Sequence, residues 1–427
     1  MIQARLMFIK AFRPHLRSIG VLATGHFPMP RFWSVYTAAP HRVLFLPGAI
    51  QGVIAMLWWL LDLESRLAGG VGLAVAGLPA PLLHGWLMVY GFFPFFIFGF
   101  LFTAAPNWLS GPGVSRTAYL STALGLSTGA ALLYFGQSSL GLLLHLLGWS
   151  AALQALLATL RAGKDADKRH AWATWAALCL GAAGEMLMLA GLLFERGEWL
   201  QPALELGVWG CLAPLFLTVC HRMIPFFTSR VVGDYVMIRP YAPLWAMWTA
   251  CLLHVALTAT GQGGLTWLVD LPLAALAFWF SSRWGFLRGF QVRLLAMLHV
   301  AFLWAGAAFV LHGLDSLAGF LGLAWSAGQA PLHALGIGFF GAMLIGMASR
   351  VSLGHSGRAL RADTATWWLF WLLQVVAMLR MLPEMSAGLA PDRIVSVAGL
   401  AWVLVFGAWA WKYAPMAWRP RVDGKAG

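Results

Sequence analysis

Charged residues are scarce in this sequence. Asp, Glu, Lys and Arg make up 10% of the 427 residues, whereas 60% are hydrophobic. No stretch combines low hydrophobicity with dense charge, as the surface of a soluble domain would. Such a composition excludes a water-soluble globular protein and is typical of helices that face lipid. We therefore expect an integral membrane protein with the lipid bilayer as its surroundings.

Cysteine and acidic residues are also few. The four cysteines all fall within apolar runs, where a thiol usually acts as a small buried hydrophobic group, so disulfides are not expected. The 15 acidic residues are outnumbered by 28 basic ones, giving a net charge of +13. Because the basic residues stand singly between apolar runs, without spaced aromatics, nucleic acid is not an expected partner.

Apolar runs long enough to cross a hydrocarbon layer of about 30 Å as helices of about 20 residues recur along the chain. The predicted fold class is all-α, a polytopic membrane bundle of about twelve transmembrane helices within residues 41–412. No loop between them is long enough for a separate domain. The predicted spans are 43–62, 82–105, 115–135, 138–160, 171–194, 202–229, 240–260, 264–282, 293–313, 330–349, 364–382 and 392–412.

The distribution of Lys and Arg predicts the orientation of the bundle. With the N-terminus inside, 24 of the 28 basic residues fall on the cytoplasmic side, and this excess over short loops is the positive-inside signal. Both termini are therefore expected in the cytoplasm. Residues 1–40 form a basic segment without an uninterrupted apolar core or small-residue cleavage site, so we expect it to stay on the protein, and residues 413–427 form a cytoplasmic tail.

Two predicted helices begin in a similar way. PLLHG at 81–85 and PLHAL at 331–335 each place a histidine within three residues of a proline. They lie eight predicted helices apart, a spacing compatible with three repeat units of four helices each. A chance match of two short segments in an apolar background is the alternative.

Histidines are prominent among the polar residues at membrane depth, where polar side chains need a partner or a function. By position along each helix, one group lies near the expected outer ends, while His221, His299 and His355 lie toward the cytoplasm. Neutral imidazole is a common ligand of haem iron and copper, so the outer group predicts metal or cofactor binding. For any single histidine, the alternative is a hydrogen bond to a neighbouring helix. The outer group comprises His84, His145, His254, His312 and His333.

Isolated charged residues within the apolar runs are further candidates. Glu185 and Asp270 could relay protons or bind a cation, or could pair with Arg or His across the bundle. Arg222 and Arg350 lie near the inner ends of two helices. Together with His355, they could hold haem propionates or another anion by charge-assisted hydrogen bonds. Snorkelling of the arginines to the lipid headgroups is the alternative.

Three longer stretches carry a more specific pattern. They are HGWLMVYG followed by FFPFFIFGFLFTAAPNWLSGPG at 84–113, CHRMIPFFTSR at 220–230 and SRVSLGHSGR at 349–358. In order and spacing, these stretches resemble the NnrS family, and the resemblance spans predicted helices 2 to 10. It implies a bacterial inner-membrane protein that carries haem and copper and is associated with nitric oxide metabolism and resistance to nitrosative stress.

One departure from that family concerns copper. The family often shows His-x-His-Glu-Met at helix 2, where this chain has HGWLM at 84–88. The first histidine and the methionine are kept, but Trp86 and Leu87 replace a second ligand and its carboxylate partner. This counts against a metal held by the missing histidine, copper above all.

There is a looser similarity to the catalytic subunit of haem–copper oxidases and nitric oxide reductases. That subunit also has twelve helices, with haem-ligating histidines on helices 2 and 10, where this chain has His84 and His333. Its paired histidines on helices 6, 7 and 10 are missing here, and His254 stands alone on helix 7. A dinuclear centre of that kind is therefore not expected.

The prediction is a polytopic membrane haem protein that handles nitric oxide or a related species, with His84 and His333 as the leading ligand candidates. His145, His254 and His312 are further candidates for a metal, including copper. Haem iron could bind nitric oxide as a sensor or sink, or could turn it over with electrons from quinone or another donor. The alternative is a transporter of an ion or small molecule without haem.

Overall fold

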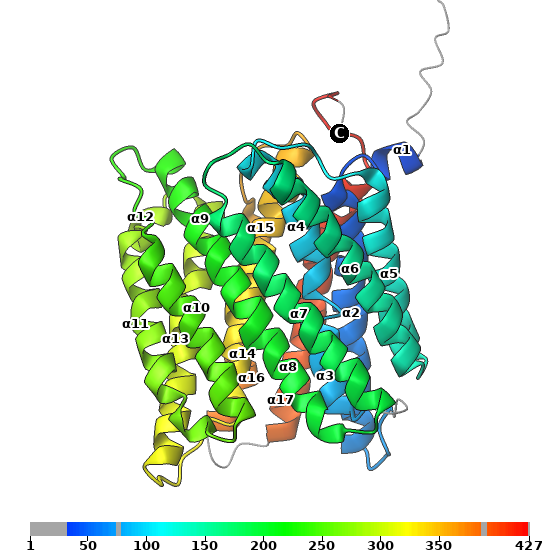
Figure 1. Cartoon of the computed structure of the whole chain (residues 1–427), viewed down its shortest axis with the longest axis vertical. Helices are drawn as coiled ribbons and strands as arrows, with labels where there is room; N and C mark the ends of the chain where they lie inside the picture. The colour runs from blue at the N-terminus through cyan, green and yellow to red at the C-terminus, as the bar shows by residue number, and fades with distance from the viewer. Residues whose placement is uncertain (1–31, 74–77, 386–390, 426–427) are drawn as a thin grey trace, which may run out of the picture. The chain divides into compact units, whose positions relative to one another are not determined.

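The computed structural model describes residues 32–73, 78–385 and 391–425. Most of the predicted basic segment 1–40 lies outside the described residues, and the helical unit begins at Phe32. Every regular element in the described ranges is a helix, which confirms the predicted all-α class. Figure 1 shows the long helices running side by side, with α1 and the C-terminus at the same end of the bundle.

The elements of the first half of the chain are α1 (Phe32–Tyr36), α2 (Pro40–Leu67), α3 (Ala80–Val89), α4 (Phe93–Trp108), α5 (Arg116–Tyr134), α6 (Ser138–Ala162), α7 (Arg169–Leu193), η1 (Gly197–Trp199) and α8 (Leu200–Glu205). The next elements are η2 (Leu206–Leu212), α9 (Ala213–Val231), α10 (Tyr241–Ala259), η3 (Gly263–Leu265), α11 (Trp267–Arg283), α12 (Phe286–Gly289) and α13 (Arg293–Phe320). The last elements are α14 (Ala330–His333), η4 (Ala334–Gly341), α15 (Ala342–His355), α16 (Thr364–Met385), α17 (Pro391–Tyr413) and η5 (Ala414–Ala417).

Ten segments of the described chain are long and apolar enough to cross a membrane, and each contains or closely matches one of the predicted spans. The chain is therefore a multipass membrane protein. The two remaining predicted spans, 115–135 and 264–282, form α5 and α11, which are less suited to crossing alone. Helix α11 has 17 residues, and α5 contains several Ser, Thr and Gly residues. Both pack extensively on a long neighbour, α5 on α6 and α11 on α13, and so complete the bundle.

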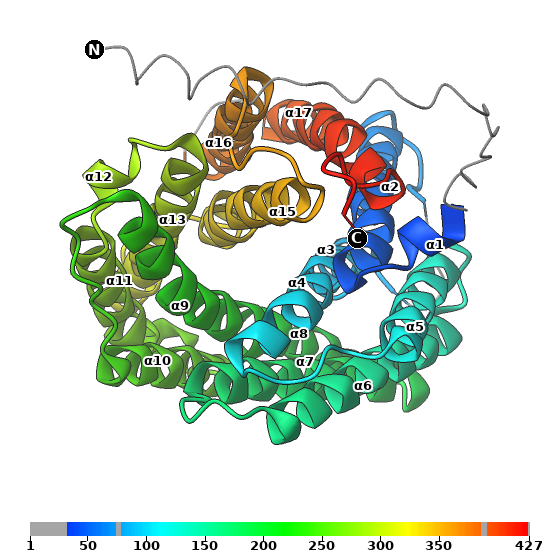
Figure 2. The same cartoon turned by 90° about the horizontal axis from the view of Figure 1, so that it is seen from above.

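Contacts between consecutive crossing segments are compatible with the predicted four-helix units, which stay a prediction. Segment pairs α2 with α4, α7 with η2, and α13 with η4 occupy equivalent places in three successive groups of four. The same holds for α5 with α6, α10 with α11, and α16 with α17. Seen along the helices in Figure 2, α4, α9 and α15 lie nearer the middle, and α5, α6, α10, α11 and α16 lie around them.

The second, sixth and tenth crossing segments share a break in the α-helix. The second is interrupted between α3 and α4, while the sixth and tenth contain the π-helical segments η2 and η4. Segments of π-helix are rare and occur frequently at functional sites, because the wider turn moves side chains out of the regular register. We therefore expect a functional site in the interior of the bundle, near these breaks.

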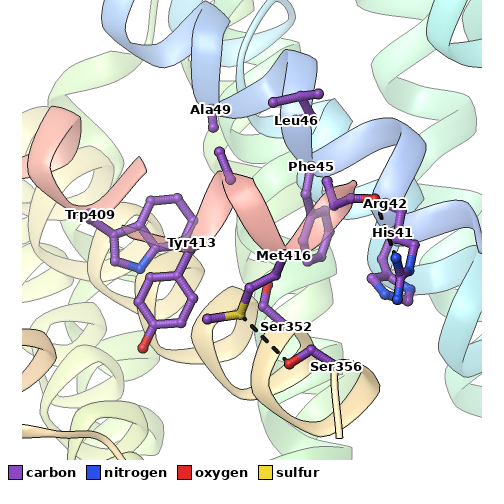
Figure 3. A pocket seen from close by; sticks show the side chains of 12 residues that line it. His41, Arg42, Phe45, Leu46, Ala49, Ser352, Ser356, Trp409, Tyr413 and Met416 are labelled. Atoms are coloured by element: carbon purple, nitrogen blue, oxygen red, sulfur yellow. Dashed lines mark hydrogen bonds between the residues drawn. The ribbon is translucent and has the colours of Figure 1, made fainter. Parts of the chain in front are cut away.

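The loops predicted to be cytoplasmic gather at one end of the bundle, which we call the basic end. There the guanidinium of Arg42, at the start of α2, donates to the backbone oxygen of Arg419 over 3.0 Å, and the backbone N–H of Val422 donates to the oxygen of Ser356 over 3.0 Å. Figure 3 shows Met416 of this C-terminal segment beside Ser356, with a distance of 3.7 Å between Sδ and Oγ. The C-terminal segment thus closes onto α2 and α15.

The orientation of the basic end is open to a direct test. We expect cysteines introduced as Lys164→Cys or Lys425→Cys to escape a membrane-impermeant maleimide added to intact cells, because the charge distribution places both in the cytoplasm. Gly197→Cys, at the opposite end, is the control and should be labelled without lysis. Efficient labelling at 164 in intact cells would reverse the orientation.

Candidate functional site

The two leading ligand candidates line one cavity. His84 comes from α3 and His333 ends α14, immediately before the π-helix η4. Their side chains share a cavity of about 430 Å³ near the end of the bundle opposite the basic end. Apolar and aromatic side chains make up most of its wall, among them Trp59 and Trp402. A cavity of this size and composition is typical of sites for cofactors and small molecules.

Contacts around the two imidazoles suit metal ligation. The Nδ1 of His333 lies 2.8 Å from the backbone oxygen of Gln329 and must donate to it, so Nε2 is the nitrogen left with a free lone pair. Ligating histidines commonly donate their other nitrogen in this way. The ring of His84 stacks on Trp59 with 4.5 Å between centroids, and its buried Nδ1 has no hydrogen-bond partner among the described residues. A Cβ at Gly336 would meet open space, so the cavity wall is free of side chain there.

Polar residues in this cavity were not predicted as site residues. Arg380 of α16 lines it and pairs with Glu384 over 2.9 Å, and Glu205 lines it while accepting a 3.0 Å hydrogen bond from Gln201. Arg380 stands inside an otherwise apolar predicted span, and that position was a signal in the sequence for a buried role. The predicted charge distribution counts Arg380 only as one of the few basic residues on the outer side.

A second predicted pair meets on α6 and α7. His145 Nδ1 lies 2.6 Å from Glu185 Oε1, and both side chains are fully buried. The ring of Trp86 meets that of His145 edge-on at 4.9 Å. Neither member of the pair lines the His84–His333 cavity. Of the two predicted alternatives for Glu185, the structure therefore shows pairing with a histidine across helices.

A third group lies on α10, α11 and α13. His254 Nδ1 donates to Asp270 Oδ1 over 2.8 Å, and the His254 ring stacks on Trp209 of η2 at 3.7 Å. His312 is the next ring, 5.7 Å from His254 between centroids. Its Nε2 and the Oδ2 of Asp270 are buried without a hydrogen-bond partner among the described residues.

These groups do not assemble a copper centre. In the part of the chain that the structure describes, no three His, Cys, Asp or Glu side chains approach closely enough to hold a metal ion together. His145 and His254 each direct Nδ1 at a carboxylate, and they belong to separate clusters. The residues predicted for copper therefore do not fit it as a group, and we derive no copper chemistry from them.

The histidines predicted nearer the cytoplasm have polar partners of another kind. His299 lies 3.2 Å from the hydroxyl of Thr228. His221 donates through Nε2 to the backbone oxygen of Pro240 over 2.9 Å, and its Nδ1 lies 2.9 Å from Nε2 of His170. A series of hydrogen bonds thus links α9 to α7 near the basic end.

This series of hydrogen bonds continues through Tyr241 to the loop before α7. The Tyr241 hydroxyl lies 2.9 Å from His170 Nδ1 and donates to Asp167 Oδ2 over 2.6 Å. The hydrogen bond from Arg169, with a smaller contribution from Tyr241, holds the pKa of Asp167 well below its usual range. Asp167 is therefore ionised at neutral pH and ends this series of hydrogen bonds at the basic end.

We expect Tyr241→Phe to lower the free energy of unfolding by about 1–2 kcal/mol, because it removes the hydroxyl that donates to Asp167 and contacts His170 Nδ1. Thermal unfolding in detergent measures this. In a cycle with Asp167→Ala, the double variant should lose less than the sum of the single variants, since both remove the same hydrogen bond. Additive losses would show that the tyrosine and the aspartate act independently.

Arg222, Arg350 and His355 line a second cavity of about 610 Å³, at the basic end. Its described lining residues and those of the His84–His333 cavity do not overlap. Arg350 follows His333 by 17 residues on one continuous segment, about 25 Å at 1.5 Å per residue. Propionates of a haem on His333 would not reach that far, so this cavity is separate from a haem site at His333.

A helical bundle with ten long apolar segments and a cavity lined by two histidines from distant segments defines the class, a multipass membrane protein. The family model described as NnrS protein matches residues 35–421, and the chain belongs to the NnrS family. This confirms the resemblance seen in the sequence over almost the whole chain. No curated protein matches it.

Proposed function

We propose that this protein binds haem between His84 and His333 and acts in nitric oxide metabolism or nitrosative-stress resistance in the bacterial inner membrane. One observation carries the proposal: in a chain of the NnrS family, two histidines about 250 residues apart line the same cavity of about 430 Å³. The two imidazoles on this cavity are the residues that would hold haem iron, for which imidazole is a common ligand.

The residues around the cavity fit this group. His333 would ligate through Nε2, since Nδ1 is held by the Gln329 carbonyl, and Trp59 fixes the plane of the His84 ring. Arg380 lies on the same wall and supplies a cation for a carboxylate group of the ligand. Apolar side chains make up most of the remaining wall and would pack against the flat faces of the macrocycle.

Haem iron, when bound, supplies a centre that ligates nitric oxide or exchanges an electron with it. A role in sensing or sequestering nitric oxide needs no further partner. A role in turning it over needs an electron donor or acceptor, and we propose membrane quinone for it. In either role the task of this chain is to hold the iron, orient its ligands and keep the cavity dry.

The test is an absorption spectrum with iron and copper analysis of the protein purified in detergent. We expect a Soret band, about one or two haems per chain, and a shift of the band when nitric oxide is added to the reduced protein. Protein that inserts normally and is purified from haem-replete cells without a Soret band would refute the proposal.

A second candidate function, passage of a small molecule through the bundle, rests on a separate observation. A small apolar cavity of about 50 Å³ shares Phe93 with the His84–His333 cavity. It shares Phe100 and Met347 with the arginine-lined cavity at the basic end. The small cavity thus shares wall residues with both larger cavities, and movement of these apolar side chains would gate a passage between them, as in channels and transporters. Ion or solute flux into proteoliposomes would support this function, and a haem-free active protein would favour it.

A further inference from the structure

We infer that the cavity at the basic end is a binding site for a soluble oxyanion, a molecule that carries a phosphate or carboxylate group. Three guanidinium groups converge on it from different parts of the chain. Arg222 comes from α9, Arg239 from the connection between α9 and α10, and Arg350 from α15. The inference concerns a different cavity from the proposed haem site and stands without it.

The arginines of this cavity have no carboxylate partner at ion-pair distance among the described residues, and the nearby Asp165 and Asp167 act on Arg222 from outside the cavity lining. Arg222, Arg239 and Arg350 form no ion pair with described residues, and none of the described residues lining the cavity is Asp or Glu. Some of the other described arginines have a carboxylate partner, as Arg169 has Asp167. Like charges gathered without a counter-ion repel one another, so a bound anion would stabilise the site.

Aromatic rings hold two of the cations in place. The guanidinium carbon of Arg222 lies 4.8 Å from the ring centroid of Trp108, and that of Arg350 lies 3.8 Å from the centroid of Phe227. Cation–π contacts orient the charged group and leave its positive charge available to a ligand. A guanidinium held in this way presents a planar set of donors, which matches the oxygens of a phosphate or carboxylate.

Neutral polar groups complete the wall. Thr103 and Asn107 of α4 line the cavity beside the arginines, and His355 ends α15 with an exposed side chain. The Thr103 hydroxyl donates to the Gly99 backbone oxygen, but the second N–H of the Asn107 amide and the His355 imidazole can donate hydrogen bonds to anion oxygens. The cavity narrows into apolar side chains, Phe100 and Met347, so a ligand with a charged head and a less polar body fits it best.

The position of the cavity in the bundle favours a soluble ligand over a lipid. Apart from Arg239, its arginines and polar groups come from α4, α9 and α15, in the second, sixth and tenth membrane-spanning segments, whose most apolar stretches are 72–83% buried inside the protein. Figure 2 shows these three helices nearer the middle of the bundle than the outer helices, away from the surface that faces lipid. A phospholipid headgroup offers the same phosphate chemistry, and binding in nanodiscs of defined lipid composition distinguishes the two sources.

Binding of radiolabelled inorganic phosphate and of succinate to the purified full-length protein, in neutral detergent at low ionic strength, tests the inference. We expect saturable binding of at least one of the two to the wild type, weakening as salt is added. Arg222→Gln and Arg350→Gln should each reduce the affinity at least tenfold, because each removes a charged hydrogen-bond donor. Arg350→Lys should retain part of it, because the charge remains.

The matched control is Arg361→Gln, which removes an exposed arginine at the same end of the bundle but outside the cavity. It should bind like the wild type, which separates loss of a site from loss of net charge. Haem content and elution as a single species should be unchanged in every variant. These readouts distinguish failure of this inference from misfolding and from failure of the proposed haem site.

Reconstitution identifies the source of the anion. Nanodiscs of phosphatidylcholine alone should leave phosphate or succinate binding intact, and added phosphatidylglycerol should not compete. Competition that Arg222→Gln and Arg350→Gln abolish would support the site while assigning it to a lipid headgroup. Absence of saturable binding of both anions and of the lipid, or equal binding by wild type and both glutamine variants, would overturn the inference.

Discussion

Purified His84→Ala and His333→Ala variants are expected to carry much less haem than the wild type, or to show a shifted Soret band, while still inserting and eluting as one species. The expectation follows from the cavity that the two side chains share and from the His333 Nε2 left free by the Gln329 carbonyl. A neutral methyl group cannot replace a bond to iron. A hydrogen bond between membrane helices, in contrast, contributes about 1 kcal/mol or less, so its loss leaves the bundle folded.

His312→Ala is the control for this pair. It removes an imidazole from the His254–Asp270 group, which does not line the His84–His333 cavity, and should leave haem content unchanged. Imidazole added during expression or purification should restore part of the Soret band in His84→Ala or His333→Ala, because the truncated side chain leaves room for it. If both alanine variants keep full haem with an unchanged spectrum, the ligand assignment is wrong, although the fold and the family would stand.

Gly148→Ala is expected to destabilise the protein by about 2 kcal/mol through the close contact of α5 with α6. A Cβ at Gly148 would lie 2.9 Å from the Cα of Gly125 and 2.8 Å from the backbone nitrogen of Leu126. Both neighbours are backbone atoms, so no side chain can rotate away and the two helices must separate. Small residues at such crossings permit the close packing that holds membrane helices together.

Gly319→Ala makes the same chemical change in α13, where the added Cβ meets no heavy atom within 4 Å. It should be neutral or slightly stabilising, since alanine favours the helix over glycine by up to about 1 kcal/mol. Thermal unfolding in detergent compares the two variants. Equal stability of Gly148→Ala and Gly319→Ala would show that the α5–α6 contact is loose enough to absorb a methyl group.

The crossing segments could be predicted because a long apolar run has one stable arrangement in lipid, a helix that satisfies its own backbone. Even the weaker segments, α5 and α11, were found at their places in the sequence. The π-helical segments η2 and η4 were not predicted, since their composition is that of ordinary apolar helix. Their geometry depends on neighbours in the bundle that periodicity within one helix does not reveal.

Individual residues of the candidate site could be predicted from the sequence, but which of them share a cavity could not. Histidines at membrane depth stand out, and so His84 and His333 could be singled out. Depth alone could not separate them from His145, because all lie at similar heights on their helices. The structure separates them by direction around the helix axis: His145 faces Glu185, whereas His84 faces Trp59 and the cavity.

The sequence by itself determined the class of protein, the positions of its helices along the chain and the polar residues that lie at membrane depth. These follow from transfer free energies, which act on each segment independently of the others. Tertiary structure alone decided which polar residues share a space: two histidines in one cavity, three arginines in another, and two histidine–carboxylate pairs apart from both. Such groupings depend on helix rotation and order around the bundle, which are set by packing between segments far apart in the chain.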